Sequence, residues 1–188
     1  MRSPRLLTAN VSWIAKRMPV VVTETYREWK PPIDGKKTVE DLLRQVSEMH
    51  LAGLRAVVLT NAGGLARKRR RARTWTRNRK IAIAEARGVY HGHWKGQPPW
   101  IELFVDRICD GIPSWALRFP FLRELMFAEV LFHEVGHHIH ATTQKEHADR
   151  EAVADKWRRA LTGPYFCRRY WYLRPLFILS RWLRRWTS

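Results

Sequence analysis

The sequence predicts an α+β fold in which an N-terminal helix and a small, mostly antiparallel sheet precede two long helices and a basic C-terminal helix. Two kinds of pattern support this class. Short segments rich in β-branched or alternating apolar residues predict strands at 55–60, 88–94 and 100–106, and the turn residues between the last two predict a hairpin. Apolar residues at helical spacing predict helices over 39–50 and from 121 onwards.

Composition limits what the chain can be. Its 188 residues are 45% hydrophobic and include ten tryptophans, which is enough for one domain with a sizeable core. A formal net charge of +18 would attract polyanions such as nucleic acid or an anionic membrane surface. The two cysteines form no metal-binding motif. The sequence has no apolar run long enough for a membrane span and no secretory signal, so we expect no transmembrane span and a cytoplasmic location.

Local signals place the first elements. Residues 20–22 are three valines and predict a short strand. Thr38 has the position of an N-cap, and Asp41 that of the capping-box acid, so we expect the first helix to begin there. Gly53 is expected to end it. Residues 1–35 are interpreted as an N-terminal arm.

Nine cations fall within residues 67–80, together with Trp75. One interpretation is a polyanion contact, in which the tryptophan stacks on a base and the cations bind phosphates. The other is a solvated loop or an exposed helix. The residues proposed for the polyanion contact are Arg69, Arg70, Arg71 and Arg73.

The main chemical motif is H-E-V-G-H at 133–137, inside a helix that is apolar on nearly all sides. Helix positions i and i+4 share a face, so His133 and His137 can reach one metal ion while Glu134 turns toward a water on it. In zinc hydrolases with this pattern, zinc lowers the pKa of the water and the glutamate takes its proton. Histidines in a buried helix need partners, and a metal supplies one.

A catalytic zinc usually takes three protein ligands. The metzincin pattern would need glycine at position 140 and a ligand at 143, but the chain has His140 and Thr143. Thr143 and Glu146 have capping-box spacing, which predicts a second helix from about residue 144. We expect that helix to end at Gly163–Pro164. His138 is expected at the surface or around the metal ligands.

On the second helix, Glu151 and Asp155 share one face. We expect Glu151 to be the third ligand and Asp155 to accept a hydrogen bond from the far ring nitrogen of a ligating histidine. The alternative is an exposed helix on which both acids pair with nearby cations, namely Lys156, Arg158 or Arg159.

Together, H-E-x-x-H at 133–137 and E-x-x-x-D at 151–155 resemble the signature of the gluzincin metallopeptidases. Their short separation resembles the compact minigluzincins and the ImmA/IrrE-type peptidases. The resemblance implies a zincin-like domain over 36–163, built from a helix, a small sheet and two metal-bearing helices. It implies His133, His137 and Glu151 as ligands, Asp155 as the residue that orients a ligating histidine, and Glu134 as the general base.

The sequence therefore favours a zinc metallopeptidase that acts on a protein or peptide. The alternative is a basic nucleic-acid-associated protein with a structural or inactive zinc site. We expect the strand at 100–106 to be the edge strand that binds substrate. Candidates for stabilising the oxyanion are His93, His147 and Tyr165. Residues 164–188 form a basic amphipathic segment that could pack on the domain, lie on an anionic membrane or bind a partner.

Overall fold

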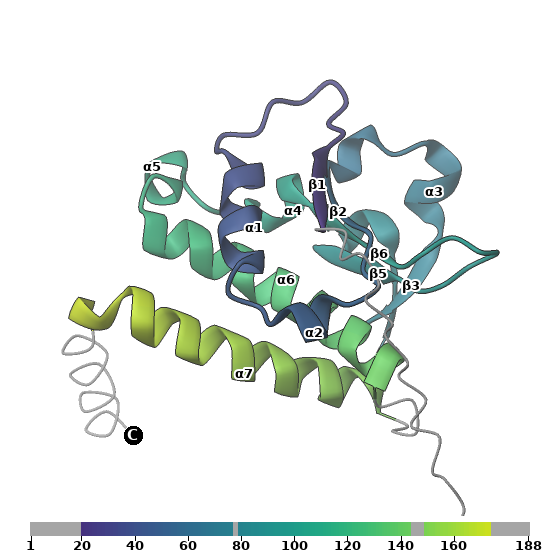
Figure 1. The fold of residues 1–188 in the computed structure, drawn as a ribbon. Coiled ribbons are helices and arrows are strands. Elements are labelled where there is room, and N and C mark those ends of the chain that lie inside the picture. The colour runs from purple at the N-terminus through teal and green to yellow at the C-terminus, as the bar shows by residue number, and fades with distance from the viewer. Residues whose placement is uncertain (1–19, 77–78, 144–148, 174–188) are drawn as a thin grey trace, which may run out of the picture.

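The computed structural model describes residues 20–76, 79–143 and 149–173 (Figure 1). Its central sheet is built from four strands, which are β1 (Val21–Glu24), β2 (Ala56–Thr60), β5 (Gly88–His91) and β6 (Trp100–Phe104). Their order in the sheet is β1-β2-β6-β5. Strands β1 and β2 are parallel, as are β2 and β6, whereas β5 runs antiparallel to β6.

The prediction of a mostly antiparallel sheet is therefore wrong, although the β5–β6 hairpin is confirmed. The chain leaves β1, passes through helix α1 (Gly35–Leu43) and returns to start β2 at the same end of the sheet. A crossover of this kind joins parallel strands, because a tight turn cannot. The sequence patterns identified the four strands of this sheet and the β5–β6 pairing, but not the parallel pairing of β1, β2 and β6.

Helix α1 begins before the predicted Thr38 because a different residue caps it. The Asp34 side chain accepts a hydrogen bond from the Lys37 backbone N–H at 2.9 Å. Thr38 lies inside the helix and donates its hydroxyl to the Asp34 carbonyl. The helix ends at Leu43, and a separate short helix, α2 (Glu48–Leu51), follows. Because the aspartate side chain satisfies one of the first free N–H groups, the helix starts directly after Asp34 and earlier than predicted.

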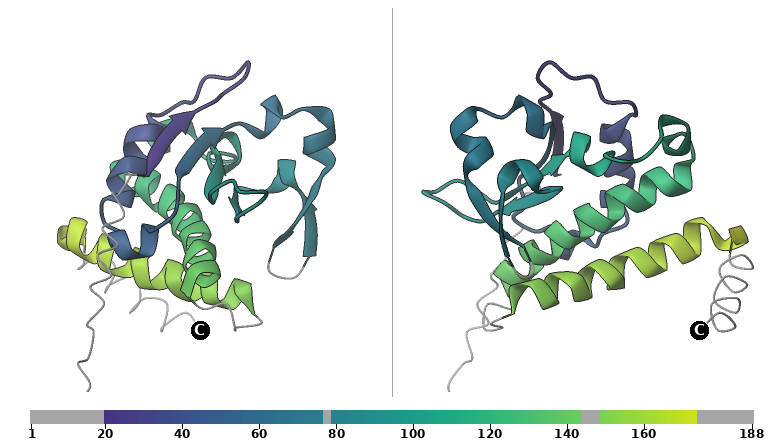
Figure 2. Two further views of the ribbon diagram at one scale, coloured as in Figure 1. Left: turned by 45° about the vertical axis from the view of Figure 1, so that its right-hand side comes forward. Right: turned by 180° about the vertical axis from the view of Figure 1, so that it is seen from behind.

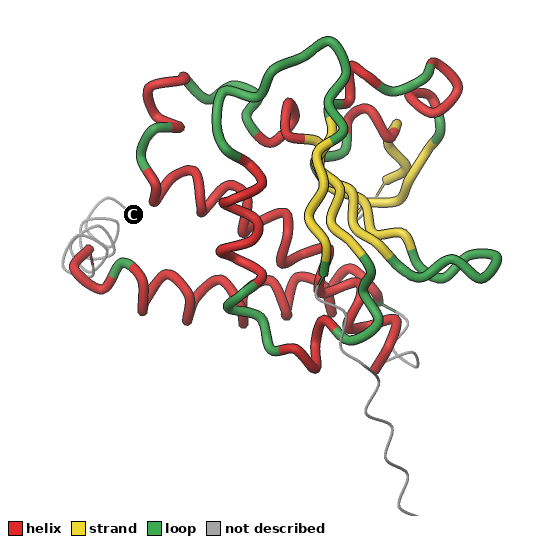
Figure 3. The backbone as a smooth tube through the Cα atoms, turned by 45° about the horizontal axis from the view of Figure 1, so that its top comes forward, coloured by secondary structure: helices red, strands yellow, loops and turns green. Residues whose placement is uncertain are grey.

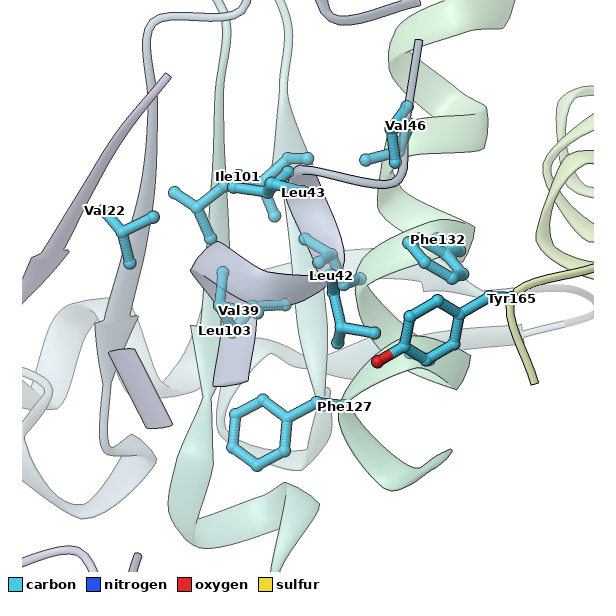
Figure 4. Close-up of a cluster of buried hydrophobic side chains, with 14 of the residues drawn as sticks. Val22, Val39, Leu42, Leu43, Val46, Ile101, Leu103, Phe127, Phe132 and Tyr165 are labelled. Atoms are coloured by element: carbon cyan, nitrogen blue, oxygen red, sulfur yellow. The ribbon is translucent and has the colours of Figure 1, made fainter. Parts of the chain in front are cut away.

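One face of the sheet carries the main core (Figure 4). Inward-facing side chains of β2 and β6 pack against α1 and the long helix α6 (Pro120–Thr143); they are Val57, Leu59, Ile101 and Leu103. Helix α7 (Arg150–Arg169) lies along the outer side of α6 (Figure 2). Its Tyr165 packs edge-on against Phe132 of α6. The molecule thus has three layers, which are the sheet, then α1 with α6, then α7 (Figure 3).

The opposite face of the sheet is covered by the basic segment. The chain there forms a short helix, α3 (Arg67–Arg71), and an antiparallel hairpin of β3 (Arg73–Thr76) and β4 (Arg79–Ala82). Two 3-10 turns, η1 (Ala62–Gly64) and η2 (Ile83–Glu85), flank them. A small apolar cluster around Phe104 fixes this part to the sheet. In Figure 2 the hairpin stands out from the sheet beside the ends of α6 and α7.

The remaining elements are α4 (Val105–Ile108), α5 (Ser114–Leu117) and η3 (Trp171–Leu173). Of the predicted C-terminal segment 164–188, the first residues belong to the end of α7 and to η3, and residues 174–188 lie outside the described part of the chain. The proposed boundaries at 35 and 163 remain predictions. No helix in the described part of the chain is long and apolar enough to cross a membrane.

Candidate metal centre

Helices α6 and α7 meet differently from the capped reversal that the sequence predicted. Thr143 is not an N-cap, because α6 continues through it and its hydroxyl donates to the Ile139 carbonyl at 2.7 Å. Helix α7 begins at Arg150, after Asp149 has capped it by accepting from the Ala152 N–H. The predicted end at Gly163–Pro164 is also wrong, since the helix continues to Arg169. Pro164 faces solvent, where a carbonyl that lacks its helical partner can bind water.

The two helices approach each other very closely at Gly136, between the two histidines of the motif. A Cβ atom at this position would lie 2.7 Å from both the Cα and the carbonyl oxygen of Ala154 on α7. Such distances are sterically forbidden, so any larger residue would force the helices apart. The absence of a side chain at Gly136 therefore sets the spacing that brings Glu151 to the histidines.

The three predicted ligands face one another across this contact. The His133 Nε2 atom is 3.4 Å from one Glu151 carboxylate oxygen, and the His137 Nε2 atom is 3.5 Å from the other. One ligand atom from each residue lies within 4.8 Å of the other two. Two ligands about 2.1 Å from a tetrahedral zinc are about 3.4 Å apart. The donor types and their spacing are therefore those of a group that could hold a metal ion.

Asp155 contacts His133 on the side of the ring that faces away from Glu151. Its Oδ1 atom is 3.2 Å from His133 Nδ1, the ring nitrogen that points away from Glu151. The same oxygen accepts a hydrogen bond from Arg158 Nε at 3.3 Å, and Arg158 also pairs with Glu129 of α6. The two alternatives considered for Asp155, histidine support and pairing with a cation, thus occur together. The arrangement favours a proton on His133 Nδ1 and leaves Nε2 for a metal.

The two imidazoles differ in their tendency to carry a proton. Burial is the main reason that the pKa of His137 falls to about 4, and the neighbouring charge on His133 adds to the effect. Burial also disfavours a charged His133, but the hydrogen bond to Glu151 and the surrounding carboxylates outweigh it and raise its pKa. Without a metal, a proton on His133 would place a positive charge beside Glu151. A metal ion can take over that role.

Glu134 lies beside this group and is 7% exposed. Burial raises the pKa of its carboxyl to about 7, against the opposing effects of the His133 charge and of a hydrogen bond from the Tyr90 backbone N–H. A carboxyl with a pKa close to neutral can both take and return a proton. The environment of Glu134 thus suits a general base.

Strand β5 is the wall of the site that faces Glu134. A Cβ at Gly88 would lie 3.0 Å from the Glu134 side chain and 2.7 Å from Val130, so only glycine lets the strand come this close. Phe104 N donates to Arg87 O, and antiparallel pairing therefore turns the backbone groups of Gly88 and Tyr90 away from β6. These groups form the open edge of the sheet.

The prediction that 100–106 is the substrate-binding edge strand is wrong. Strand β6 lies between β2 and β5 and is hydrogen-bonded on both sides. The open edge beside the candidate metal site belongs to β5 instead.

The site opens into a cleft of about 1220 Å³ between β5, the β3–β4 hairpin and the ends of α6 and α7. Its floor includes the three candidate ligands and Glu134. It is therefore large enough to admit an extended peptide segment rather than only water or a small ion.

Among the other predicted residues that the structure describes, only Arg73 lines the cleft. Arg69 of the proposed polyanion contact forms an ion pair with buried Glu102 at 2.5 Å, whereas Arg70, Arg71 and Arg73 are exposed. Neither His93 nor Tyr165 lines the cleft, and Tyr165 donates instead to Glu124. His147 is outside the described residues.

The expectation that His138 lies at the surface or near the ligands is also wrong. It is fully buried, where its Nε2 atom is 3.1 Å from the Ala52 carbonyl oxygen and its Nδ1 atom is 3.3 Å from the Tyr90 hydroxyl. Burial accordingly lowers its pKa. His138 joins β5 to the core, so Tyr90 is held at both its backbone and its side chain.

Sequence reasoning missed Gly88, Tyr90 and Gly136 as parts of the site. A glycine in the middle of a helix, as at 136, is a signal of close packing, because glycine otherwise weakens a helix. For Gly88 and Tyr90 no comparable signal exists, since their role depends on which helix lies beside the strand.

No known protein family, curated protein or solved structure matches the chain. The observations above therefore establish an α+β fold with a His133–His137–Glu151 group that could hold a metal ion.

Proposed function

We propose that this protein is a zinc-dependent peptidase in which His133, His137 and Glu151 hold the metal and Glu134 is the general base. The observation that carries the proposal is the position of Glu134, a buried carboxyl with a pKa of about 7 between the metal-binding group and an open strand edge. A site that only bound metal would not need a base at this position.

Each part of the site has its own role in the proposed hydrolysis. The open edge of β5 can pair with an extended peptide through the backbone groups of Gly88 and the carbonyl of Tyr90, whose N–H already bonds to Glu134. When bound, zinc supplies Lewis acidity, which polarises a carbonyl and makes water a nucleophile near neutral pH. Glu134 takes the proton of the attacking water and passes it to the leaving amine. Asp155 keeps the His133 ring in place through Nδ1.

The test combines metal analysis with peptide hydrolysis. We expect purified wild type to bind one equivalent of zinc and to cleave peptides, and Glu134→Gln to keep the zinc but lose about a thousandfold in rate. Retained hydrolysis in Glu134→Gln would contradict the proposed role of this residue. A wild-type protein that binds no zinc would contradict the metal site.

A second candidate function is nucleic-acid binding, which the exposed cations of α3 favour; they are Arg67, Lys68, Arg70 and Arg71. Binding of this kind weakens steeply with salt. Salt-dependent binding of DNA that survives both Glu134→Gln and Glu151→Ala, in a protein without peptidase activity, would favour this function over the first.

A further inference from the structure

Three arginines line the metal cleft without an acidic partner. Arg73 begins β3, Arg87 immediately precedes β5, and Arg150 begins α7 next to the candidate ligand Glu151. All three side chains are exposed. No carboxylate among the described residues lies within ion-pair distance of any of them.

The carboxylates that line the same cleft are already engaged, with one exception. Glu129 pairs with a fourth arginine, Arg158. Glu134 and Glu151 belong to the candidate metal centre, where a divalent ion would offset their charge. Of the described acids in the cleft, Glu85 alone remains to balance three guanidinium groups. The cleft therefore has an excess of positive charge around the place where substrate would lie.

These cations stand on both walls of the cleft. Arg73 and Arg87 belong to the strand wall and Arg150 to the helical wall. Arg150 immediately precedes the candidate ligand Glu151 at the start of α7, so its charge lies close to the candidate metal centre. A peptide paired along the edge of β5 would run past Arg87 and face Arg150 across the cleft.

We propose that the cleft selects acidic peptides, that is, segments with aspartate or glutamate close to the bond that is cleaved. This inference rests on the peptidase function proposed above. Guanidinium groups bind carboxylates through paired N–H donors, and a cleft with excess charge of one sign raises the local concentration of the opposite charge. The strongly basic chain as a whole attracts acidic partners in the same way.

The test uses matched peptides that differ only in having glutamate, glutamine or lysine around the cleavage site found with a random peptide library. Binding is measured by fluorescence anisotropy with zinc-loaded Glu134→Gln, so that turnover is not required, and kcat/KM is measured with wild type. We expect the glutamate peptide to bind about fivefold more tightly than its glutamine counterpart at low salt, since two or three exposed ion pairs contribute this much. The lysine peptide should bind most weakly.

Charge-reversal variants locate the effect. Arg150→Glu and Arg87→Glu should each reduce the preference for glutamate about threefold, as expected for one partly exposed ion pair. Arg168→Glu is the matched control, because it makes the same change in net charge at an exposed position near the other end of α7, and it should leave the preference unchanged.

The outcomes separate this proposal from the one on which it rests. Equal binding of the glutamate and glutamine peptides, or an equal loss in Arg168→Glu, would overturn the acidic preference even if hydrolysis is observed. Absence of hydrolysis with every peptide would contradict the peptidase function alone. If single-stranded DNA displaces the glutamate peptide and loses affinity in the same two variants, the arginines serve nucleic acid and the proposal fails.

Discussion

Each end of the α6–α7 pair places a glutamate of one helix against polar residues of the other, but only at one end do residues of the chain supply a permanent positive charge. At the far end, Glu124 of α6 accepts hydrogen bonds from Arg169 Nε and Nη2, each with a contact at 3.0 Å, and from the Tyr165 hydroxyl at 2.5 Å. At the near end, Glu151 of α7 faces the two histidines.

The difference lies in where the positive charge comes from. Arg169 is always charged, so the far end is neutralised by the chain itself. The near end offers two imidazoles, of which His137 has a pKa of about 4 and stays neutral. It therefore requires a proton or a metal ion from outside. The same two helices thus hold a structural ion pair at one end and a candidate metal site at the other. The main difference is that the glutamate faces a guanidinium at the first and two imidazoles at the second.

Removal of the glutamate at the near end should have the largest effect on metal binding. Glu151→Ala should lower zinc affinity by more than about 100-fold, because loss of a ligand exceeds the loss from a supporting residue. Competition with a chromogenic chelator measures the affinity. An unchanged affinity would show that Glu151 is not a ligand.

The close helix contact can be broken at Gly136 and compared with the open position Gly163 on α7. Gly136→Ala should destabilise the fold by about 2–3 kcal/mol through overpacking against Ala154, and should weaken zinc binding as the helices separate. Gly163→Ala meets no atom within 4 Å and should stabilise α7 by up to about 1 kcal/mol. Urea unfolding measures both. A Gly136→Ala protein as stable as wild type would show that the contact does not set the helix spacing.

Disrupting the contact of Glu124 with Arg169 at the far end of the helix pair should lower the stability of the fold and leave zinc affinity unchanged. Burial acts to raise the pKa of Glu124, but the hydrogen bonds from Arg169 and Tyr165 outweigh it and lower the pKa. Glu124→Gln should therefore cost about 2 kcal/mol at neutral pH, as expected for hydrogen bonds to a charged group.

The pH dependence of the stabilisation by Glu124 follows from the lowered pKa of its carboxyl. The unfolded carboxyl has a pKa of about 4.3 and binds protons more tightly than the folded one. The stabilisation is thus present above this value and is lost as the pH falls through the lower folded pKa. Denaturation midpoints of wild type and Glu124→Gln should converge in acid. A constant difference between them would contradict the shift.

The smallest effect on zinc affinity is expected from Asp155, which contacts His133 on the side away from Glu151. Asp155→Asn should lower zinc affinity about tenfold, since the ring of His133 loses a charged partner but keeps its place on the helix. Calorimetric titration with zinc measures it. A loss as large as that of Glu151→Ala would make Asp155 a ligand itself.

Much of the candidate site follows from local spacing. His133 and His137 share a face because any helix places i and i+4 together, and Glu151 and Asp155 do so for the same reason. Local spacing does not show that the two helix faces meet. A buried helix that carries polar groups needs partners for them, however, and the three side chains do converge. The sequence therefore predicted which three side chains come together, but not where α6 ends and α7 begins.

The parts that could not be predicted depend on contacts between distant residues. Val21 pairs with Ala56, and Ala56 with Trp100, so the parallel sheet is decided by pairs far apart in the chain. Helix α1 is capped by Asp34 and not by Thr38, although Thr38 has the capping-box spacing. The roles of Gly88 and Tyr90 exist only because β5 is an edge strand that lies against α6.

The position of Glu151 in the first turn of α7 has a consequence for the durability of the protein in a cell. The far end of α7 is fastened by Arg169, whereas its first turn would be fastened by an exchangeable ion. Such an ion acts as a removable cross-link between His137 and Glu151, and closing a loop of about 15 residues is worth about 3 kcal/mol in the chain-entropy model. Treatment with a chelator should accelerate proteolytic cutting around the start of α7 while the far end stays protected. Metal supply would then set the lifetime of the folded protein as well as its activity.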